Sequence, residues 1–379
     1  MIEPFDDDET ALRGFLRRLR APDQPTGHGI DLSASLADIM HRAAGVSSAE
    51  HLRRTTPAAN VKAAQGAGQG GSATFTHECL FYRDERSYLD GVLPFVEEAL
   101  ATDTPVLVAV PGGNGVLLRH ELGWRAEKMS FLDMSIEGRN PNRIIPAVLD
   151  AFISEHAGRP VAIIGEAIWP GRSATEYPAC VQHEALINMA FDGALATILC
   201  PYDTRGLEPE VLADAASTHP ILTSSGERQT SRSYGSPKQV FAEFNRPLSD
   251  PPRSAASMAF DDTDDLPRLR EFVGRHADAS GLSDDRLVDL QMAANEIATN
   301  TIRHSGGPGI VQVWAEDGHV VCDVSDGGHI ADPLVGRLAS SVGGEHGRGL
   351  LVINYLCDLV RVHTEPGSTS IRLFMHVSA

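Results

Sequence analysis

Several features are scarce or missing in this 379-residue chain, and each absence excludes a class of protein. The five cysteines are scattered and form no CxxC pair, so the sequence signals neither a disulfide framework nor a zinc site, and we interpret them as reduced thiols, mostly in the core. No apolar run approaches the roughly 20 residues that span a bilayer, and the start, MIEPFDDDE, lacks the basic and apolar regions of a signal peptide. We therefore expect a cytoplasmic protein without membrane contact.

Basic residues are also in deficit. The chain has 32 Lys and Arg against 51 Asp and Glu, a formal net charge of -19. Because phosphate backbones and anionic membranes are bound by clustered Lys and Arg, this balance argues against direct nucleic-acid binding, although a local basic pocket stays open. The length suits two domains plus tails, and the 42% hydrophobic content is enough to fill both cores.

The chain divides into four segments by composition. Residues 1–73 carry acids, prolines and the tract AAQGAGQGGS, which predicts a flexible N-terminal arm with two short helical stretches. In residues 74–222, apolar runs of strand length such as VLVAVP and PVAIIGEA alternate with stretches of helical period, which predicts an α/β domain with a mainly parallel sheet covered on both faces. Residues 223–258 are polar and rich in Pro, Gly and Ser, and are typical of a linker.

The last segment, residues 259–379, predicts helix, helix, two strands, a long loop, helix and two strands. The Asp317–Gly318 pair favours a tight hairpin turn, so the strands on either side of it are expected to be antiparallel. This order indicates an α+β sandwich with helices on one face of a mixed or antiparallel sheet.

Within this segment, the stretch AANEIATNTIRHS places Glu296, Asn300 and His304 four residues apart, on one face of a predicted amphipathic helix. A carboxylate can take a proton from an attacking hydroxyl, and an amide oxygen one turn later can help to hold Mg²⁺. Alone, such a row is more often a solvated stripe.

Two glycine-containing motifs follow the helix. Asp326-Gly327-Gly328 ends a predicted strand, and Gly347-Arg348-Gly349 opens another helix, where exposed backbone N–H groups attract an anion. An aspartate that accepts a hydrogen bond from an exocyclic amine could select adenine. Each motif alone is a weak signal, but the three in this order favour a nucleotide site.

With these three motifs in order, residues from about 255 to 379 resemble the Bergerat-fold ATPases of gyrase and histidine kinases, and most closely the serine kinases that act as anti-sigma factors. The resemblance implies that Glu296 is the general base, Asn300 a Mg²⁺ ligand and Asp326 the acceptor of the adenine amine. It also implies that Gly328 lets the nucleotide approach closely and that Gly347, Arg348 and Gly349 wrap the phosphates, with Arg348 adding a positive charge. Thr369 would place its hydroxyl beside the adenine. His304 matches a common family residue without a firm role.

The preceding domain shows no Walker-type GxxxxGK[ST] and no GxGxxG after a strand. Its runs HECLFYRDERSYLDGVLPFVEEAL, VQHEALINMAF and CPYD resemble the sensory domain called MEDS, whose ligands are suggested to be small hydrocarbon derivatives. Polar residues at strand ends and on helices are the candidates for contact with a small-molecule ligand. They are His77, Tyr82, Arg83, Asn140, Arg143, Glu166, His183, Glu184, Tyr202 and Asp203.

His183-Glu184 has the form of a phosphoaccepting histidine followed by an acid, but its neighbours are apolar and no long helix pair precedes the ATPase segment, so we assign His183 to the sensory fold. The resemblances together predict a cytoplasmic ATP-dependent serine kinase whose partners are a sigma factor and an anti-anti-sigma STAS-domain protein, with a homodimer one option. The alternatives are a sensor histidine kinase, and a nucleotide-gated binding module without phosphotransfer.

Overall fold

The computed structural model describes residues 75–338 and 348–377. The expected N-terminal arm and residues 339–347 of the glycine-rich loop, Gly347 among them, lie outside the described residues. A compact unit spans residues 72–379 and contains both predicted domains.

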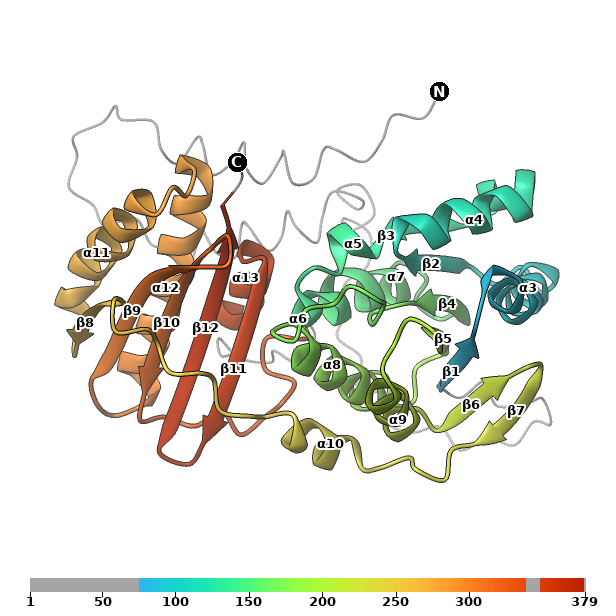
Figure 1. Ribbon diagram of the computed structural model, residues 1–379. Coiled ribbons are helices and arrows are strands. Elements are labelled where there is room, and N and C mark those ends of the chain that lie inside the picture. Colours follow the sequence, from blue (N-terminus) through green and yellow to red (C-terminus); the bar gives the residue numbers. More distant parts are fainter. Residues whose placement is uncertain (1–74, 339–347, 378–379) are drawn as a thin grey trace, which may run out of the picture. The chain divides into compact units, whose positions relative to one another are not determined.

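The first domain is built on a seven-stranded sheet with the order β3-β2-β4-β5-β1-β6-β7 (Figure 1). All neighbouring strands are parallel except the last pair, β6 and β7. The strands are β1 (Thr76–Tyr82), β2 (Val106–Val110), β3 (Ser130–Asp133), β4 (Val161–Gly165), β5 (Ala196–Asp203), β6 (Ile221–Ser224) and β7 (Glu227–Thr230). The predicted α/β class with a mainly parallel sheet is confirmed.

Both faces of this sheet are buried. In β4, Val161 and Ile163 belong to one apolar cluster, whereas Ala162 and Ile164 belong to a second cluster. Because successive side chains point to opposite faces of a strand, the two clusters lie on the two faces of the sheet. A strand that is apolar along its whole length is what such burial requires, and this pattern made β2, β4 and β5 predictable.

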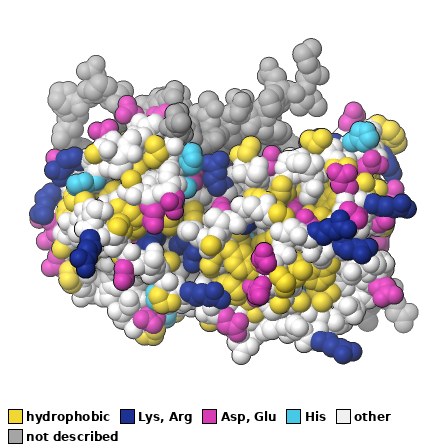
Figure 2. Space-filling view, in the orientation of Figure 1, with side chains coloured by type: hydrophobic (Ala, Val, Ile, Leu, Met, Phe, Trp, Pro, Cys, Tyr) yellow, Lys and Arg dark blue, Asp and Glu magenta, His cyan; other side chains and the backbone are white. Residues whose placement is uncertain are grey.

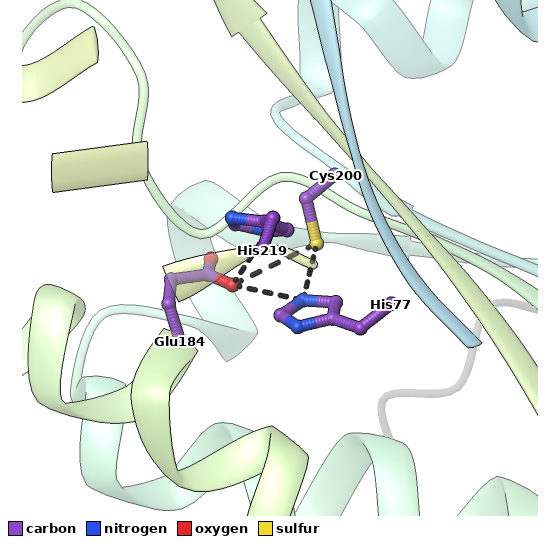
Figure 3. A group of neighbouring side chains, drawn as sticks. All are labelled: His77, Glu184, Cys200 and His219. Carbon is purple, nitrogen blue, oxygen red and sulfur yellow. Dashed lines mark hydrogen bonds and ion pairs between the residues drawn. The ribbon is translucent and has the colours of Figure 1, made fainter. Parts of the chain in front are cut away.

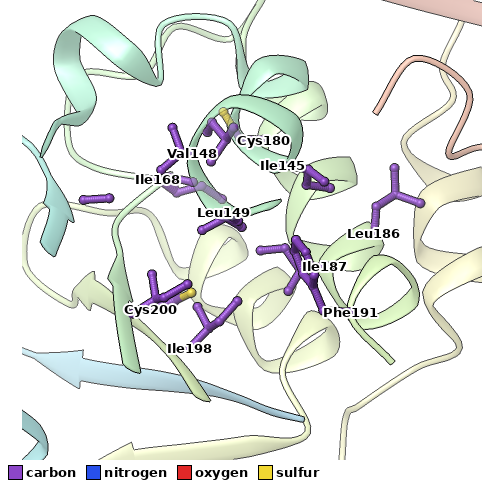
Figure 4. Packing of buried hydrophobic residues seen from close by; sticks show 14 of the residues in the cluster. Ile145, Val148, Leu149, Ile168, Cys180, Leu186, Ile187, Phe191, Ile198 and Cys200 are labelled. Carbon is purple, nitrogen blue, oxygen red and sulfur yellow. The ribbon is translucent and has the colours of Figure 1, made fainter. Parts of the chain in front are cut away.

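The helices of this domain are α3 (Glu85–Ala101), α4 (Gly112–Leu122), α5 (Met134–Glu137), α6 (Pro141–Ile144), α7 (Asp150–Glu155), α8 (Tyr177–Ala190), α9 (Pro209–Thr218) and α10 (Pro237–Glu243), with a 3-10 turn, η1 (Gly123–Lys128), and a π turn, η2 (Ile145–Leu149). Helix α3 begins with a capping box between Asp84 and Ser87. Helix α8 is buried almost all round, and Figure 4 shows its Leu186 and Ile187 among the apolar side chains of this core.

The second domain holds a five-stranded sheet with the order β11-β12-β10-β9-β8, in which every neighbouring pair is antiparallel (Figure 1). Its strands are β8 (Ala256–Phe260), β9 (Gly309–Glu316), β10 (His319–Asp326), β11 (Leu359–Glu365) and β12 (Ser368–His376). Its helices are α11 (Leu266–Ala279), α12 (Asp284–His304) and α13 (Arg348–Leu356), with the short turn η3 (Thr263–Asp265). The predicted α+β sandwich is confirmed, and Asp317 and Gly318 both have positive φ at the hairpin turn.

The polar segment 223–258, predicted as a linker, contains more regular structure than a linker needs. Its residues complete β6, form β7 and α10, and begin β8. β7 pairs at the edge of the first sheet, and all four of its residues, Glu227 to Thr230, are exposed, so no apolar pattern marked it as a strand. β8 was missed because its run of five residues is short and alternates between buried and exposed positions next to the predicted boundary.

Candidate functional site

Helix α12 carries the predicted Glu296, Asn300 and His304 row along its C-terminal half. Ser283 precedes the helix, and Asp284 and Asp285 lie in its first turn, where acidic side chains favour a helix start. Glu296 and Asn300 are half-buried and His304 is exposed. Burial raises the pKa of the Glu296 carboxyl, with the Arg303 charge opposing the shift, so this carboxylate is a better proton acceptor than an exposed one.

Glu296 faces the start of α13. A Cβ atom added to Gly349 would lie 2.1 Å from Oε1 of Glu296 and 2.7 Å from its Cγ, so a larger residue would need the Glu296 side chain to move. Gly349 of the third motif therefore lets the start of α13 approach the carboxylate of the first. Arg348 begins α13, and its side chain lies outside what the structure describes.

Asp326 ends β10 next to the same helix. Its Oδ2 accepts a hydrogen bond from Thr301 Oγ1 at 2.5 Å, and its Oδ1 accepts one from the Gly328 backbone N–H at 2.6 Å. Thr301 follows Asn300 directly on α12, so helix and strand are tied together at this point. Thr301 was not predicted from the sequence, because a threonine inside an amphipathic helix carries no functional signal.

Thr369 lies beside Asp326 on the neighbouring strand. The two residues are register partners of β12 and β10, and Thr369 Oγ1 donates to the Gly328 carbonyl at 3.1 Å. Gly328 also lies close to Ser305 at the end of α12, since an added Cβ would meet the Ser305 Cβ at 3.4 Å. The structure thus gathers Glu296, Asp326, Gly328, Gly349 and Thr369 around the C-terminal half of one helix.

These residues suit a magnesium nucleotide. A carboxylate and an amide oxygen are the ligand types that Mg²⁺ takes, and two glycines allow backbone close to the site. The half-buried Glu296, whose pKa is raised, can act as a proton acceptor.

A second polar group lies in the first domain at the carboxyl ends of the strands. Glu166 follows β4, and it accepts hydrogen bonds from Tyr82 Oη at 3.3 Å and from Asn114 Nδ2 at 2.7 Å. Burial raises the pKa of Glu166 to about 7, against the lowering effect of these two donors. Asp203, the register partner of Tyr82, adds a repulsive charge. Parallel sheets bind ligands at this edge, so Tyr82, Glu166 and Asp203 remain the better sensory candidates.

Arg83 follows Tyr82 at the same edge and is exposed. His77 and Tyr202 lie apart from this edge group, buried in the interior on the helix α8 side. His183 is buried in α8, where burial lowers its pKa to about 4. The ten predicted residues therefore do not form one pocket. Asn114 was not predicted from the sequence. It lies in the first turn of α4, the helix after β2, and donates to Glu166 from there.

Asn140 and Arg143 contact the second domain. The Asn140 Nδ2 donates to the backbone carbonyl of Asn354 in α13 at 3.0 Å, and this bond is buried. The Arg143 guanidinium pairs with Glu137 at 2.8 Å and lies over the Tyr355 ring. Asn140 and Arg143, predicted as ligand contacts, thus lie in the contact between the two domains. Their positions in the sequence gave no sign of this contact.

Comparison with protein families decides the assignment of the two domains. Residues 76–220 match the model described as MEDS, the methanogen/methylotroph DcmR sensory domain, and residues 260–375 match the histidine kinase-like ATPase domain. The chain combines a MEDS domain with a histidine kinase-like ATPase domain. The residues around α12 described above lie within the ATPase domain, and Glu166 lies within the MEDS domain.

Solved structures give more distant likenesses. The RsbU and RsbW domains of a Mycobacterium tuberculosis protein are 17% identical, cover 32% of this chain and 32% of that one, and have a TM-score of 0.25. The histidine kinase AdeS of Acinetobacter baumannii is 12% identical, covers 33% of this chain and 68% of that one, and has a TM-score of 0.22. This chain thus spans about a third of the first of these structures. A search among curated proteins gave no match.

Two further observations concern binding surfaces. Among the described residues, none of the helices has the length and apolar character needed to cross a membrane. On the face seen in Figure 2, Lys and Arg side chains are scattered among acidic ones.

Proposed function

We propose that the chain is a signalling kinase in which the MEDS domain controls an ATP-dependent serine kinase of the anti-sigma type. The reaction is the transfer of the γ-phosphoryl group of ATP to a serine hydroxyl of an anti-anti-sigma STAS-domain partner. One observation carries the proposal: the three motifs meet at α12. Glu296 of this helix lies against Gly349, and Thr301 of the same helix donates to Asp326.

In this mechanism the protein positions its substrates and accepts one proton. Asp326 would accept a hydrogen bond from the adenine amine. Thr301 and the Gly328 N–H hold the Asp326 carboxylate in place. Asn300 would hold Mg²⁺, which neutralises charge on the phosphates when bound. Glu296 takes the proton of the serine hydroxyl as the new oxygen–phosphorus bond forms and the bond from the γ-phosphorus to the bridging oxygen of ADP breaks.

Burial of His183 favours serine transfer over autophosphorylation at this histidine. The His183 side chain is only 2% exposed in α8, so it cannot reach a phosphoryl donor without local unfolding. Phosphorylation of a histidine on another protein stays a second candidate, since the ATPase domain type is shared with histidine kinases. A nucleotide-gated binding module is the third.

Control by the MEDS domain is supported by the contacts of α13. Asn140 and Asn142 donate to the carbonyls of Asn354 and Val360 at 3.0 and 2.9 Å. The Asn354 side chain in turn donates to the Gly336 carbonyl at 3.0 Å, just before the glycine-rich loop. Leu334 and Leu338 of the same segment pack against the apolar core of the MEDS domain. A change in that core therefore has a direct route to Leu334 and Leu338 and to α13, whose Gly349 lies against Glu296.

Phosphotransfer from labelled ATP to a purified STAS-domain protein tests the proposal. We expect an acid-stable phosphoserine, lost in Glu296→Gln, with ATP binding retained. Glu271→Gln, which changes an exposed glutamate of α11, is the matched control and should keep full transfer. By calorimetry, Asn300→Ala should abolish Mg²⁺-dependent nucleotide binding, whereas Thr299→Ala should not. Acid-labile phosphate would favour the histidine kinase, and ATP binding without transfer would leave the binding module.

A further inference from the structure

The interior of the MEDS domain holds a cluster of four side chains that the sequence motifs did not bring together: His77 of β1, Glu184 of α8, Cys200 of β5, and His219 after α9 (Figure 3). Each offers one ligand atom, and all four atoms lie within 4.8 Å of one another. All four side chains are buried, none of them more than 2% exposed. A buried group of two imidazoles, a thiol and a carboxylate needs an explanation.

The hydrogen bonds on the outer side of the two histidines fix their tautomers. Nδ1 of His219 lies 2.8 Å from the Ala215 carbonyl, which can only accept, so this nitrogen carries the proton. Nδ1 of His77 lies 3.2 Å from Asn188 Oδ1. The Asn188 amide nitrogen donates to the Thr218 carbonyl at 2.8 Å, so its oxygen must face His77, whose Nδ1 therefore also carries the proton.

Both Nε2 atoms consequently present lone pairs to the centre of the cluster. Nε2 of His77 lies 3.3 Å from Cys200 Sγ and 3.3 Å from Glu184 Oε2. Nε2 of His219 lies 3.4 Å from the same Oε2 and has no hydrogen-bond partner in the described part of the chain. Glu184 Oε2, His77 Nε2 and His219 Nε2 therefore all direct lone pairs toward one another. Within the cluster, the thiol proton of Cys200 is the one proton that can lie between these atoms. A bound cation removes this conflict.

Four of the six distances between the ligand atoms are close to those around a tetrahedral ion, and all six are within 4.8 Å. Bonds of about 2.0–2.3 Å to nitrogen, oxygen and sulfur place the ligand atoms of a tetrahedral Zn²⁺ about 3.3–3.6 Å apart. The three nitrogen contacts above are 3.3, 3.3 and 3.4 Å, and Cys200 Sγ lies 3.7 Å from Glu184 Oε2. A thiolate and a carboxylate also balance the charge of a divalent ion, so the buried site as a whole carries no net charge.

We propose that His77, Glu184, Cys200 and His219 bind one Zn²⁺ ion in a closed tetrahedral site. Four protein ligands leave no open position, so the ion ties the structure together and does not activate water. It joins β1, β5, α8 and the α9–β6 connection, and the Nδ1 bonds to Asn188 and Ala215 orient the two imidazoles as outer partners do at metal sites. The site is independent of the kinase reaction proposed above.

The same residues contain a thiol–imidazole–amide arrangement, Cys200, His77 and Asn188, of the kind used by cysteine nucleophiles. Two observations argue against that role. Cys200 is 2% exposed, so a substrate cannot reach it. Burial raises the pKa of the Cys200 thiol well above its ordinary value, the opposite of an activated thiol.

Metal analysis of the purified full-length protein, expressed in zinc-supplied medium, tests the site. We expect about one zinc per chain, lost in Cys200→Ala and in His219→Ala. Cys180→Ala is the matched control, because Cys180 is a buried thiol of the same domain outside the cluster, and it should keep the ion. Zinc retained by both cluster variants would place the metal elsewhere and overturn the proposal.

A second measurement needs no variant and so does not depend on how well the variants fold. Replacement of the metal in the wild-type chain by Co²⁺ should give the thiolate charge-transfer band and the intense visible bands of a tetrahedral cobalt site. A chain that carries no zinc after purification and gives no such bands on Co²⁺ titration would rule the site out.

Discussion

At the scale of single residues, Glu166 makes the stability of the MEDS domain depend on pH. Burial raises its folded-state pKa from 4.5 to about 7. Between these values the unfolded chain loses the proton while the folded chain keeps it, so stability falls as pH rises. A pKa rise from 4.5 to about 7 corresponds to a loss of about 3 kcal/mol of stability as the pH rises through this range.

We therefore expect Glu166→Gln to remove this loss. Glutamine keeps an oxygen for the Asn114 amide and can donate to the Tyr82 hydroxyl, so both contacts survive. Urea unfolding at pH 5 and pH 8 should show wild type losing about 2.5 kcal/mol more than the variant over this range. Glu98→Gln, at an exposed glutamate of α3, should behave as wild type. Parallel pH profiles of wild type and Glu166→Gln would contradict the assignment.

The residues that the sequence could and could not reveal differ in how far apart they lie along the chain. Glu296 and Asn300 were predictable because one helical turn brings them together. Asp326 and Gly349 were predictable as parts of short motifs. His219 and Cys200 come from different elements and meet only through the parallel sheet and its crossovers, so their spacing carries no metal signal.

At the scale of elements, the outer side of the ATPase sheet depends on a buried ion pair. Arg372 of β12 and Asp323 of β10 are register partners, and their side chains pair at 2.8 Å. Arg372 also donates to the carbonyl and hydroxyl oxygens of Ser249, and its guanidinium lies over Trp314. Arg372 therefore holds Ser249, in the segment before β8, against the sheet. This segment has a fixed place in the ATPase domain although it was predicted as a linker.

Asp323→Ala should lower the free energy of unfolding by about 3–5 kcal/mol, because it leaves a buried guanidinium without its carboxylate. Asp278→Ala, at an exposed position of α11, is the control and should change stability by less than about 0.5 kcal/mol. Chemical denaturation of the full chain gives both values. A cost for Asp323→Ala as small as that of the control would show that solvent reaches Arg372.

Elements were predictable where burial imposes a period. β2, β4 and β5 are apolar along their length because both faces of their sheet are covered, and α12 repeats its apolar side chains with the helical period. β7 has no buried face and therefore no pattern. Its place in the sheet follows from pairing with β6 across a two-residue turn, Ser225 and Gly226, which both have positive φ.

At the scale of the whole molecule, the bonds from α6 to α13 make the MEDS and ATPase domains one compact unit. The sequence predicted two domains and a nucleotide site, but it placed Asn140 in a ligand pocket. The hydrogen bonds between the domains come from single polar side chains in distant segments. Such side chains form no periodic pattern and no motif, so the sequence does not reveal the contact.

Asn140 permits a sharp test of this coupling, because its two side-chain atoms do different things. Its Oδ1 accepts from the Asn142 N–H and caps α6, whereas its Nδ2 donates to Asn354 in α13. Asn140→Asp keeps the cap and removes the donor, and it places a carboxylate against the Asn354 carbonyl. We expect faster amide hydrogen exchange in residues 349–356 by about five-fold or more, with α6 unchanged.

Asn140→Ala is the companion variant, since it removes both the cap and the donor and should therefore also raise exchange in α6. Hydrogen exchange followed by mass spectrometry resolves the two helices. Because α13 begins beside Glu296, Asn140→Asp should also weaken ATP binding even though it lies in the MEDS domain. If α13 stays equally protected and the affinity for ATP does not change, the proposed control of the ATPase domain does not pass through α6.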